Sequence, residues 1–421
     1  MPAQDVLVIG LGYVGLPLAV RAARAGFRVT GYDTSAAIAA GLNAGRSHVD
    51  DVSDEEVTAA RARGFRATAG EAGIGPQDVI VICVPTPLSQ ADGPDLGAVR
   101  AAAQAAGRLL RPGTLVSLES TTYPGTTDEV VRPLLEKTSG LSAGIGFSLV
   151  FSPERIDPGN PEFGLANTPK IIGGVTPSCT EAAAAFYGVI CEQVVRAASA
   201  REAEMAKLLE NTYRHVNIAL VNEMAIFCRE LGVDLHDAIR CAATKPFGFA
   251  PFYPGPGVGG HCIPIDPNYL SYKVRTLGYP FRFVELAQEI NGRMPGYVTE
   301  RAAELLNRNA QPVNGARVLL LGVTYKKDIA DQRESPARPI ARKLRARGAA
   351  VTYHDPYVPA WQVDGQDVPR AAGLQAAAAA ADLVIVLQAH RHYDLAQLVG
   401  TARLLLDTRG VVRAAPHVEA L

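Results

Sequence analysis

The fold of the first third of the chain is decided by the stretch VLVIGLGYVG, residues 6–15. Its apolar start predicts a buried strand over Val6–Ile9, and the glycines lead into an amphipathic helix over Leu16–Ala25. A second apolar run, residues 27–32, ends at Asp33. This order of strand, glycine-rich turn, helix, strand and acid is that of a dinucleotide-binding βαβ unit.

Each part of this unit has a physical task. Gly10 allows the tight turn, Gly12 lets a pyrophosphate approach, and Gly15 lets the helix pack closely on the strand. The amide groups at the helix N-terminus favour the phosphates. Asp33 would accept from the ribose hydroxyls and repel a 2′-phosphate, which favours NAD over NADP; the alternative is a purely structural turn. The turn residues expected at the cofactor are Gly10, Gly12, Tyr13, Val14 and Gly15.

Three further apolar runs continue the same parallel sheet. They predict strands over residues 79–84, 114–118 and 147–151, with helices between them over 97–110 and 128–137. Cys83 is expected to be a core residue inside its strand.

In doubly wound sheets, ligands bind beyond the carboxyl ends of the strands. The segments after these three strands are therefore expected at the cofactor crevice, with Pro85, Thr86 and Thr121 beside NAD. Thr121 and Glu154 are candidates for handling a proton or water.

A long helix is predicted over residues 201–231, and it would join two domains. Lys207, Asn211 and His215 recur at every fourth position, so they lie on one face. The first two form a donor pair that could stabilise an oxyanion. On the helix alone, a solvated polar stripe is the favoured alternative, and His215 is given no other role.

The segment that follows predicts a loop carrying a nucleophile. Residues 244–255, TKPFGFAPFYPG, are too rich in proline and glycine for a helix or a central strand. Their aromatic side chains, Phe252 and Tyr253, suit a sugar or a base. The next turn, GGHCIPIDP at 259–267, presents Cys262, which attacks carbonyls as a thiolate. Asp266 could position water or move a proton. The alternative for Cys262 is a buried apolar residue.

A second open α/β sheet is predicted in the last third of the chain. Its strands are expected over residues 318–322, 351–354, 383–387 and 404–406, with a helix over 331–347. Its first turn lacks the glycine triplet. Lys326, Lys327, Arg333 and Arg409 there suit an anion other than a second dinucleotide, and ordinary surface basic residues are the alternative.

Composition narrows the class of protein. The chain has 421 residues, 48% of them hydrophobic and 20% charged, which favours a globular protein of two or three domains. A net charge of −1 argues against a general nucleic-acid or membrane binder. The six cysteines form neither a disulfide framework nor a zinc pattern, so no metal is expected. No apolar run reaches membrane-spanning length and no signal peptide is apparent, so we expect a cytoplasmic protein.

Several separate motifs together resemble one family. They are GLGYVGLPLA, ESTTYPGTT, SPERIDPGN, the Lys207/Asn211 helix, GVGGHCIPIDP and YKKDIADQRESPA. This set, spread over essentially the whole chain, is similar to the nucleotide-sugar 6-dehydrogenases of the UDP-glucose/GDP-mannose dehydrogenase family. The TKPFGFAPFYPGPG loop and SPERIDPGN resemble the branch that acts on UDP-N-acetylhexosamines, chiefly UDP-N-acetylglucosamine.

The resemblance implies a fold. We expect two Rossmann-like α/β domains joined by a long central helix: an NAD-binding domain over 1–198, a helical dimerisation domain with the cysteine over 199–309, and a nucleotide-sugar-binding domain over 310–421. It also implies a homodimer that shares the long helix.

The resemblance further implies the oxidation of a sugar C6 alcohol to a carboxylate, with reduction of two NAD. Cys262 would carry a thiohemiacetal and then a thioester, and Lys207 and Asn211 would stabilise the oxyanions. Asp266 would assist proton transfer and orient Lys207, while Glu154, together with Thr121, would handle the water. Residues expected to contact the nucleotide sugar are Glu154, Arg155, Lys207, Asn211, Phe252, Tyr253, Gly259, Lys326 and Arg409.

Two other functions remain open at this point. One is a two-electron β-hydroxyacid-type dehydrogenase, which has no use for Cys262 or for a third domain. The other is a non-catalytic nucleotide-sugar sensor, which needs no nucleophile.

Overall fold

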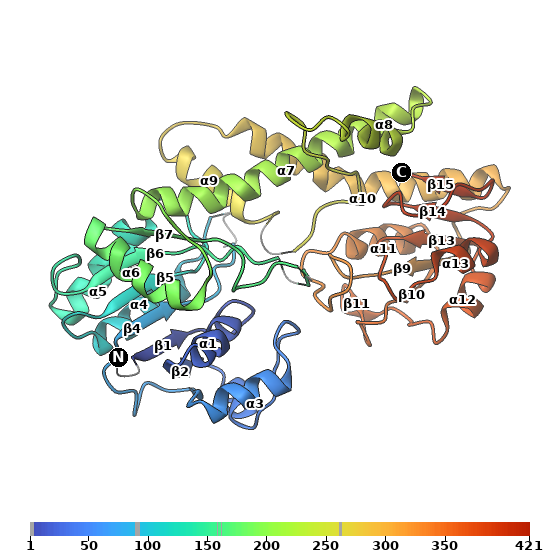
Figure 1. Ribbon diagram of the computed structural model, residues 1–421. Helices are drawn as coiled ribbons and strands as arrows, with labels where there is room; N and C mark the ends of the chain where they lie inside the picture. Colours follow the sequence, from blue (N-terminus) through green and yellow to red (C-terminus); the bar gives the residue numbers. More distant parts are fainter. Residues whose placement is uncertain (1–3, 89–92, 158, 161, 261–262) are drawn as a thin grey trace. The chain divides into compact units, whose positions relative to one another are not determined.

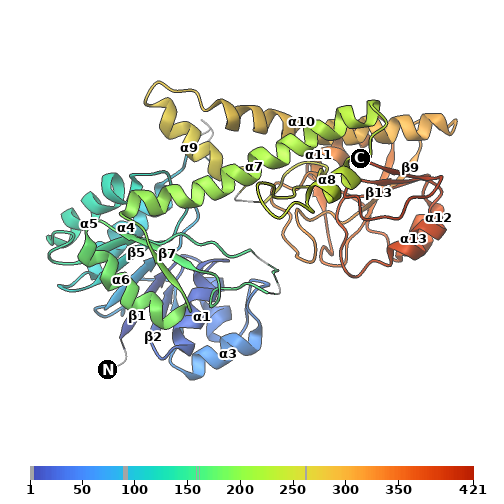
Figure 2. The same cartoon turned by 45° about the horizontal axis from the view of Figure 1, so that its top comes forward.

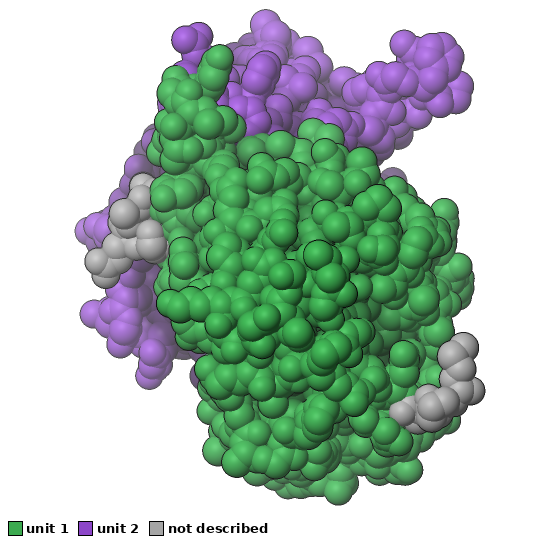
Figure 3. Space-filling model, turned by 90° about the vertical axis from the view of Figure 1, so that its left-hand side faces the viewer, with its two compact units in different colours: residues 1–210, 268–279 green, residues 211–267, 280–421 purple. Residues whose placement is uncertain are grey.

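The computed structural model describes residues 4–88, 93–157, 159–160, 162–260 and 263–421 (Figure 1). The chain packs into two compact units, which Figure 3 distinguishes by colour. The first contains Met1–Glu210 and Asn268–Tyr279, and the second contains Asn211–Pro267 and Pro280–Leu421. The helix α7 (Ala200–Glu230) has residues in both units. The division into three domains stays a prediction.

The first unit is built on an eight-stranded sheet with the order β3-β2-β1-β4-β5-β6-β7-β8. Neighbouring strands are parallel except for β7, which runs antiparallel to β6. The strands are β1 (Asp5–Ile9), β2 (Arg28–Tyr32), β3 (Arg66–Thr68), β4 (Val79–Ile82), β5 (Leu115–Leu118), β6 (Ser148–Phe151), β7 (Lys170–Gly174) and β8 (Val194–Arg196).

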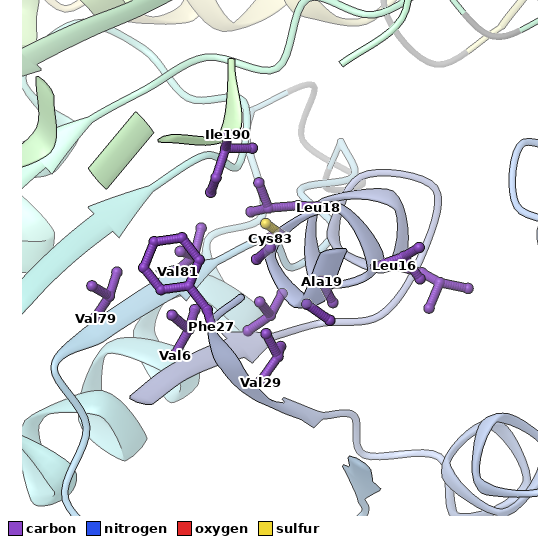
Figure 4. Close-up of a cluster of buried hydrophobic side chains, with 14 of the residues drawn as sticks. Val6, Leu16, Leu18, Ala19, Phe27, Val29, Val79, Val81, Cys83 and Ile190 are labelled. Carbon is purple, nitrogen blue, oxygen red and sulfur yellow. The ribbon is translucent and has the colours of Figure 1, made fainter. Parts of the chain in front are cut away.

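Helices cover both faces of this sheet, because the side chains of its buried strands point alternately to either side. One face packs against α1 (Gly15–Arg24), α2 (Ala36–Asn43), α3 (Asp54–Ala62) and α6 (Pro177–Ile190). The other packs against α4 (Gly97–Leu109), α5 (Arg132–Ser139) and the start of α7. Figure 4 shows Cys83 among the apolar side chains of the first face. Its thiol is buried, which raises the pKa of Cys83 well above its ordinary value, and this confirms it as a core residue.

The second unit contains a five-stranded parallel sheet with the order β10-β9-β13-β14-β15. Its strands are β9 (Arg317–Leu321), β10 (Ala350–His354), β13 (Leu383–Val386), β14 (Leu405–Asp407) and β15 (Val418–Ala420), and β11 (Gln362–Val363) and β12 (Gln366–Asp367) form a separate hairpin. One face packs against α10 (Arg282–Arg308) and α11 (Ala337–Ala346), and the other against α12 (Leu374–Ala380) and α13 (Leu395–Thr401). Figure 2 shows the same helices from a second direction.

The remaining helices are α8 (Leu235–Ala242) and α9 (Asp266–Arg275). The α/β fold class, with a mainly parallel sheet, a fully parallel sheet and a long helix, is confirmed. No helix of the described chain combines the length and the apolar character that crossing a membrane requires.

Two predicted helices begin differently from the expectation. The helix expected over 128–137 starts as a π-helical turn, η1 (Thr127–Val131), before α5. The helix expected from residue 331 starts only at Ala337. Residues 331–336 are not helical because Glu334 has a left-handed backbone with φ 50°. The side chain of Arg333 is instead paired with Asp331.

Candidate active site

The glycine-rich turn after β1 leaves no room for side chains at two of its three glycines. Gly10 has φ +90°, and a Cβ there would lie 2.7 Å from the carbonyl oxygen of Cys83. A Cβ on Gly15 would lie 1.8 Å from the carbonyl oxygen of Gly10, which shows how closely α1 packs on the turn. At Gly12 a Cβ would meet nothing within 4 Å. The open space at Gly12, together with the start of α1, fits a bound pyrophosphate.

Asp33 lies at the end of β2, where its carboxylate is held by two backbone groups. Leu11 N–H donates to Oδ2 at 3.0 Å, and Ser35 N–H donates to Oδ1 at 2.9 Å. The residue is half-buried, so the oriented carboxylate can still accept from ribose hydroxyls. Tyr13 is exposed and Val14 is half-buried on the turn itself. These residues could hold NAD, as the sequence predicted.

The segments after β4 and β5 are joined to each other and to α9. The Ser120 hydroxyl donates to the carbonyl oxygen of Val84 at 2.7 Å. The Tyr269 hydroxyl on α9 donates to the carbonyl oxygen of Thr86, whose side chain is buried. Pro85 is exposed and Thr121 is half-buried. Tyr269 was not singled out from the sequence, because α9 was not predicted.

The loop after β6 carries Glu154, and the two oxygens of this carboxylate have different surroundings. Oε1 accepts from the backbone N–H of Arg155 at 2.6 Å and of Ile156 at 2.5 Å. Oε2 is buried and has no hydrogen bond among the described residues. The Lys170 Nζ lies 3.8 Å from Oε2. A buried carboxylate oxygen that lacks a donor can accept from water or from a substrate hydroxyl.

Arg155 is turned toward protein groups. Its guanidinium donates to the Glu210 carboxylate of α7 at 2.6 and 3.2 Å, and to the carbonyl oxygen of Pro169 at 2.7 Å. These contacts anchor the Glu154 loop to α7 and to the start of β7. Sequence reasoning missed this arrangement because Glu210 is 55 residues away from Arg155. A contact of Arg155 with substrate stays a prediction.

The polar stripe on α7 is buried, so the alternative of a solvated stripe is wrong. Lys207 is 8% exposed, and Asn211 and His215 are each 3% exposed. Burial lowers the pKa of His215 to about 4, so the ring is neutral at pH 7. Its backbone oxygen accepts from the Asn291 amide of α10 at 3.3 Å. His215 is thus a neutral structural residue, while Lys207 and Asn211 carry the donors that the predicted chemistry needs.

Asn211 and Asp266 are brought together inside the second unit. The Asn211 amide nitrogen donates to Asp266 Oδ2, and the Arg214 guanidinium donates to the Asn211 carbonyl oxygen. Asp266 is 1% exposed and is the first residue of α9. The pair fixes which way the Asn211 amide points, and the amide nitrogen carries a second N–H that can donate to a ligand. Arg214 was not singled out from the sequence.

The glycines before the cysteine turn are required by close backbone packing. A Cβ on Gly259 would lie 2.6 Å from the carbonyl oxygen of Glu334, and one on Gly260 would lie 2.7 Å from the Tyr325 ring. Gly260 N–H also donates to the carbonyl oxygen of Arg333 at 2.9 Å. The turn therefore rests on the segment that follows β9. Cys262 lies outside the described residues.

Phe252 and Tyr253 form part of a coil without helix or strand, as predicted. Phe252 packs edge-on against Tyr213 of α7 at 5.6 Å and joins a small apolar cluster. Tyr253 is 49% exposed and stacks on His236 at 5.9 Å. The structure thus gives Phe252 a packing role, and sugar contacts by either ring stay predictions.

The basic residues of the second sheet differ in their surroundings. The Arg409 Nε donates to the carbonyl oxygen of Leu387 at 2.7 Å, and burial lowers the pKa of Arg409 to about 10, so it keeps its charge at pH 7. Lys326 is half-buried on the segment after β9, whereas Lys327 is exposed. Arg333 is exposed and paired with Asp331. Arg409 and Lys326 remain the better candidates for an anion.

The chain matches three family models in sequence order. Residues 4–191 match the NAD binding domain of the UDP-glucose/GDP-mannose dehydrogenase family. Residues 201–293 match the central domain of this family, and residues 319–414 match its UDP binding domain.

Known proteins resemble the chain over most of its length. It is 37% identical to the UDP-N-acetyl-D-glucosamine 6-dehydrogenase of Pseudomonas aeruginosa over 361 residues, which are 86% of this chain and 84% of the relative. The structure of UDP-D-ManNAc dehydrogenase from Pyrococcus horikoshii has a TM-score of 0.89 at 31% identity and covers 99% of both chains. A UDP-glucose dehydrogenase from Pyrobaculum islandicum has a TM-score of 0.85 at 28% identity and covers 99% of this chain and 96% of its own.

Proposed function

The chain belongs to the UDP-glucose/GDP-mannose dehydrogenase family and is an NAD-dependent nucleotide-sugar dehydrogenase, and we propose that it oxidises the C6 alcohol of a UDP-N-acetylhexosamine to the carboxylate. The names of its relatives, which include UDP-N-acetylglucosamine and UDP-N-acetylmannosamine dehydrogenases, support an N-acetylated sugar. UDP-N-acetylglucosamine is the first substrate to test, and UDP-glucose is the second.

The observation that carries the proposed mechanism is the buried Asn211–Asp266 pair. Asp266 stands four residues after Cys262, so an oriented amide and a carboxylate accompany the segment that holds the nucleophile. A pure binding protein has no need for this combination of thiol, amide and buried acid. The same combination suits an acyl intermediate that must form and then be hydrolysed.

The first oxidation converts the C6 alcohol to an aldehyde, with loss of a hydride from C6 and a proton from the hydroxyl. NAD, when bound, accepts the hydride in each of the two oxidations. The Cys262 sulfur then adds to the aldehyde carbon and gives a thiohemiacetal, and loss of a second hydride from C6 and of the proton from its hydroxyl leaves a thioester. The thiohemiacetal anchors the sugar between the two oxidations, because a free aldehyde could escape.

The remaining residues act on charge and protons. Lys207 and the Asn211 amide stabilise negative charge on the C6 oxygen. Asp266 assists proton transfer. Glu154, together with Thr121, takes a proton from the water that attacks the thioester, and the C–S bond breaks to give the carboxylate and the Cys262 thiol. Arg409 and Lys326 are proposed to bind the nucleotide diphosphate.

A homodimer is the proposed assembly. Large apolar side chains are exposed along α7, a pattern typical of a covered interface. They are Met205, Leu209, Tyr213, Leu220 and Phe227. Light scattering should give twice the chain mass, and Leu209→Glu together with Leu220→Glu should reduce it to one chain; a monomeric wild type would contradict the proposal.

The decisive experiment measures NADH formed per sugar nucleotide consumed, with UDP-N-acetylglucosamine, UDP-N-acetylmannosamine and UDP-glucose side by side. The proposed four-electron oxidation gives two NADH with at least one of them. Cys262→Ser should stop the reaction after the first oxidation or abolish it. A yield of one NADH would indicate a two-electron dehydrogenase, and none with any nucleotide sugar would indicate a sensor.

A further inference from the structure

A buried ion pair that the proposed mechanism does not use lies beside Glu154. The Lys170 Nζ donates to Glu119 Oε2 at 2.7 Å, and the two side chains are 4% and 0% exposed. Lys170 is the first residue of β7, and Glu119 directly follows β5. Burying each of two charges carries a large desolvation cost, so a pair of this kind is weak evidence for a purely stabilising role.

The ion pair is held in a fixed position. The Tyr187 hydroxyl donates to Glu119 Oε1 at 2.5 Å, and it also shares a hydrogen bond of 2.8 Å with the Ser117 hydroxyl. Lys170 also donates to the carbonyl oxygen of Pro153, the residue before Glu154, at 3.3 Å. Its ammonium is therefore tied to the Glu154 loop as well as to Glu119.

Lys170 thus faces two carboxylates with a single positive charge. Its Nζ lies 3.8 Å from Glu154 Oε2, the oxygen that lacks a hydrogen bond among the described residues. Burial by itself would lower the pKa of Lys170, but the Glu119 and Glu154 carboxylates raise it above its ordinary value. The ammonium is therefore charged throughout the neutral range.

Other titratable groups near this cluster are mostly neutral. Burial raises the pKa of Cys83 and of Tyr187 well above their ordinary values, and it raises the pKa of Cys191 to about 11. Lys207 contributes a further positive charge in this region. Arg155 is paired with Glu210. Among the described residues, the Lys170 ammonium lies 3.8 Å from the free oxygen of Glu154 and stabilises its negative charge, while the Glu119 and Glu154 carboxylates repel each other.

We propose that Lys170 and Glu119 are positioning residues that set the protonation of Glu154, with the Lys170 ammonium favouring the carboxylate form and Glu119 limiting this effect. The inference rests on the proposed role of Glu154 as the group that accepts a proton from water. A carboxylate that must accept a proton and then release it works best when it is neither too acidic nor too basic. A cation shared with a second carboxylate provides that balance.

The test is the dependence of kcat on pH, measured as NADH formation from UDP-N-acetylglucosamine or whichever of the three sugar nucleotides is turned over. In Glu119→Gln, Lys170 acts on Glu154 alone, so the acidic limb should move to lower pH by about one unit. In the double variant Glu119→Gln/Lys170→Met, both members of the ion pair are replaced together, so neither is left charged without the other, and Glu154 loses its cation. Its acidic limb should move to higher pH by about one unit.

Tyr187→Phe is the matched control, because it removes a hydrogen bond to Glu119 and no charge; its acidic limb should stay in place. A merely structural role for the ion pair would lower kcat or stability in both variants without shifts of opposite sign. Acidic limbs that coincide with that of the wild type, or that shift in the same direction, would overturn the inference.

Glu154→Gln separates this inference from the proposed function. If it turns over at the wild-type rate, Glu154 is not the proton acceptor, and both the assignment and the inference fail. If it is slow while the two charge variants keep the wild-type acidic limb, the inference alone fails.

Discussion

In both parallel sheets, the glycine that follows the first strand donates its N–H to the last residue of the second strand. Gly10 donates to the carbonyl oxygen of Tyr32 at 2.8 Å, and Gly322 donates to that of His354 at 3.0 Å. Both glycines have left-handed backbones, with φ of +90° and +72°. The two turns therefore leave their strands in the same way.

The acid after the second strand is also held alike. Asp33 accepts from Leu11 N–H at 3.0 Å, and Asp355 accepts from Val323 N–H at 2.7 Å. Each acid also accepts from the N–H two residues later, which is Ser35 N–H at 2.9 Å in the first sheet and Tyr357 N–H at 2.8 Å in the second. The turn after the first strand and the acid after the second strand therefore make the same hydrogen bonds in the two units.

The side chains make the two sites different. Asp33 is half-buried, but Asp355 is 0% exposed, and the His390 ring contacts its carboxylate at 3.1 Å through Nε2. The His390 Nδ1 accepts from Asp328 N–H at 2.8 Å, which ties the segment after β9 to the same ring. The acid that could read a ribose in the first sheet is thus a structural residue in the second. Fold alone does not select the ligand; the residues around the shared turn do.

The largest expected effect on folding comes from Gly15→Ala. The new Cβ would lie 1.8 Å from the carbonyl oxygen of Gly10, so the turn or α1 must move. We expect a loss of more than about 3 kcal/mol in the free energy of unfolding, and loss of NAD binding. Urea denaturation and NAD titration measure the two effects.

Gly41→Ala is the matched control for this change, because its Cβ would meet only the carbonyl oxygen of Arg46 at 3.9 Å inside α2. It should stabilise the protein by roughly 0.5–1 kcal/mol. If Gly15→Ala bound NAD as tightly as the wild type, NAD binding would not depend on the close packing of α1 on the turn.

Asp355→Ala should affect folding and leave NAD binding unchanged. It removes the acceptor for Val323 N–H, Tyr357 N–H and the His390 ring, all at a fully buried position. We expect a loss of about 3 kcal/mol in the free energy of unfolding. An unchanged NAD dissociation constant in the folded fraction is the second expected result, and weaker NAD binding would contradict the division of roles between the two acids.

The same residue gives a pH dependence with a defined sign. Burial raises the pKa of Asp355, but the hydrogen bonds from His390, Tyr357 N–H and Val323 N–H lower it more, so the pKa lies below its ordinary value. Its stabilising effect is therefore complete above the unfolded pKa of about 4 and is lost as the pH falls through the folded pKa. The stability difference between wild type and Asp355→Asn should shrink below about pH 4.

Asp33→Ala should have a small effect on stability and a large effect on NAD binding, the reverse of Asp355→Ala. It removes a half-buried acceptor for Leu11 N–H and Ser35 N–H, which should cost about 1 kcal/mol of stability. The dissociation constant for NAD should rise by about tenfold, a change of about 1.4 kcal/mol, and the preference for NAD over NADP should fall. Calorimetric titration with both dinucleotides tests this. An unchanged NAD/NADP ratio would mean that Asp33 does not read the ribose.

The sequence was sufficient wherever the chemistry is local. The glycine triplet, Asp33 and the long helix follow from spacing within a few turns of chain, and the structure confirms the turn and α7. The ion pair of Glu119 with Lys170 could not be predicted, because the two residues are 51 positions apart and are joined by the reversal of β7 against β6. The same holds for His390, which reaches Asp355 from 35 residues away.

The burial of polar side chains was the other feature that sequence periodicity could not predict. Lys207, Asn211 and His215 have the spacing of a solvated stripe, yet other segments cover them. The Asn211–Asp266 contact depends on α9 beginning at Asp266, directly after a stretch of turn-forming residues that predicts only a loop. Secondary structure could largely be predicted from the sequence, whereas contacts between side chains from distant segments could not.

The smallest expected effect on folding comes from Gly12→Ala, the one glycine of the first turn with open space around it. Its Cβ would meet nothing within 4 Å and its backbone is not left-handed, so the free energy of unfolding should change by less than about 0.5 kcal/mol. The methyl group would nevertheless stand where the pyrophosphate approaches, so NAD should bind at least about tenfold more weakly. Thermal unfolding without NAD, followed by NAD titration, separates the two quantities. A variant that keeps both its stability and its NAD affinity would show that the phosphates do not pass over Gly12.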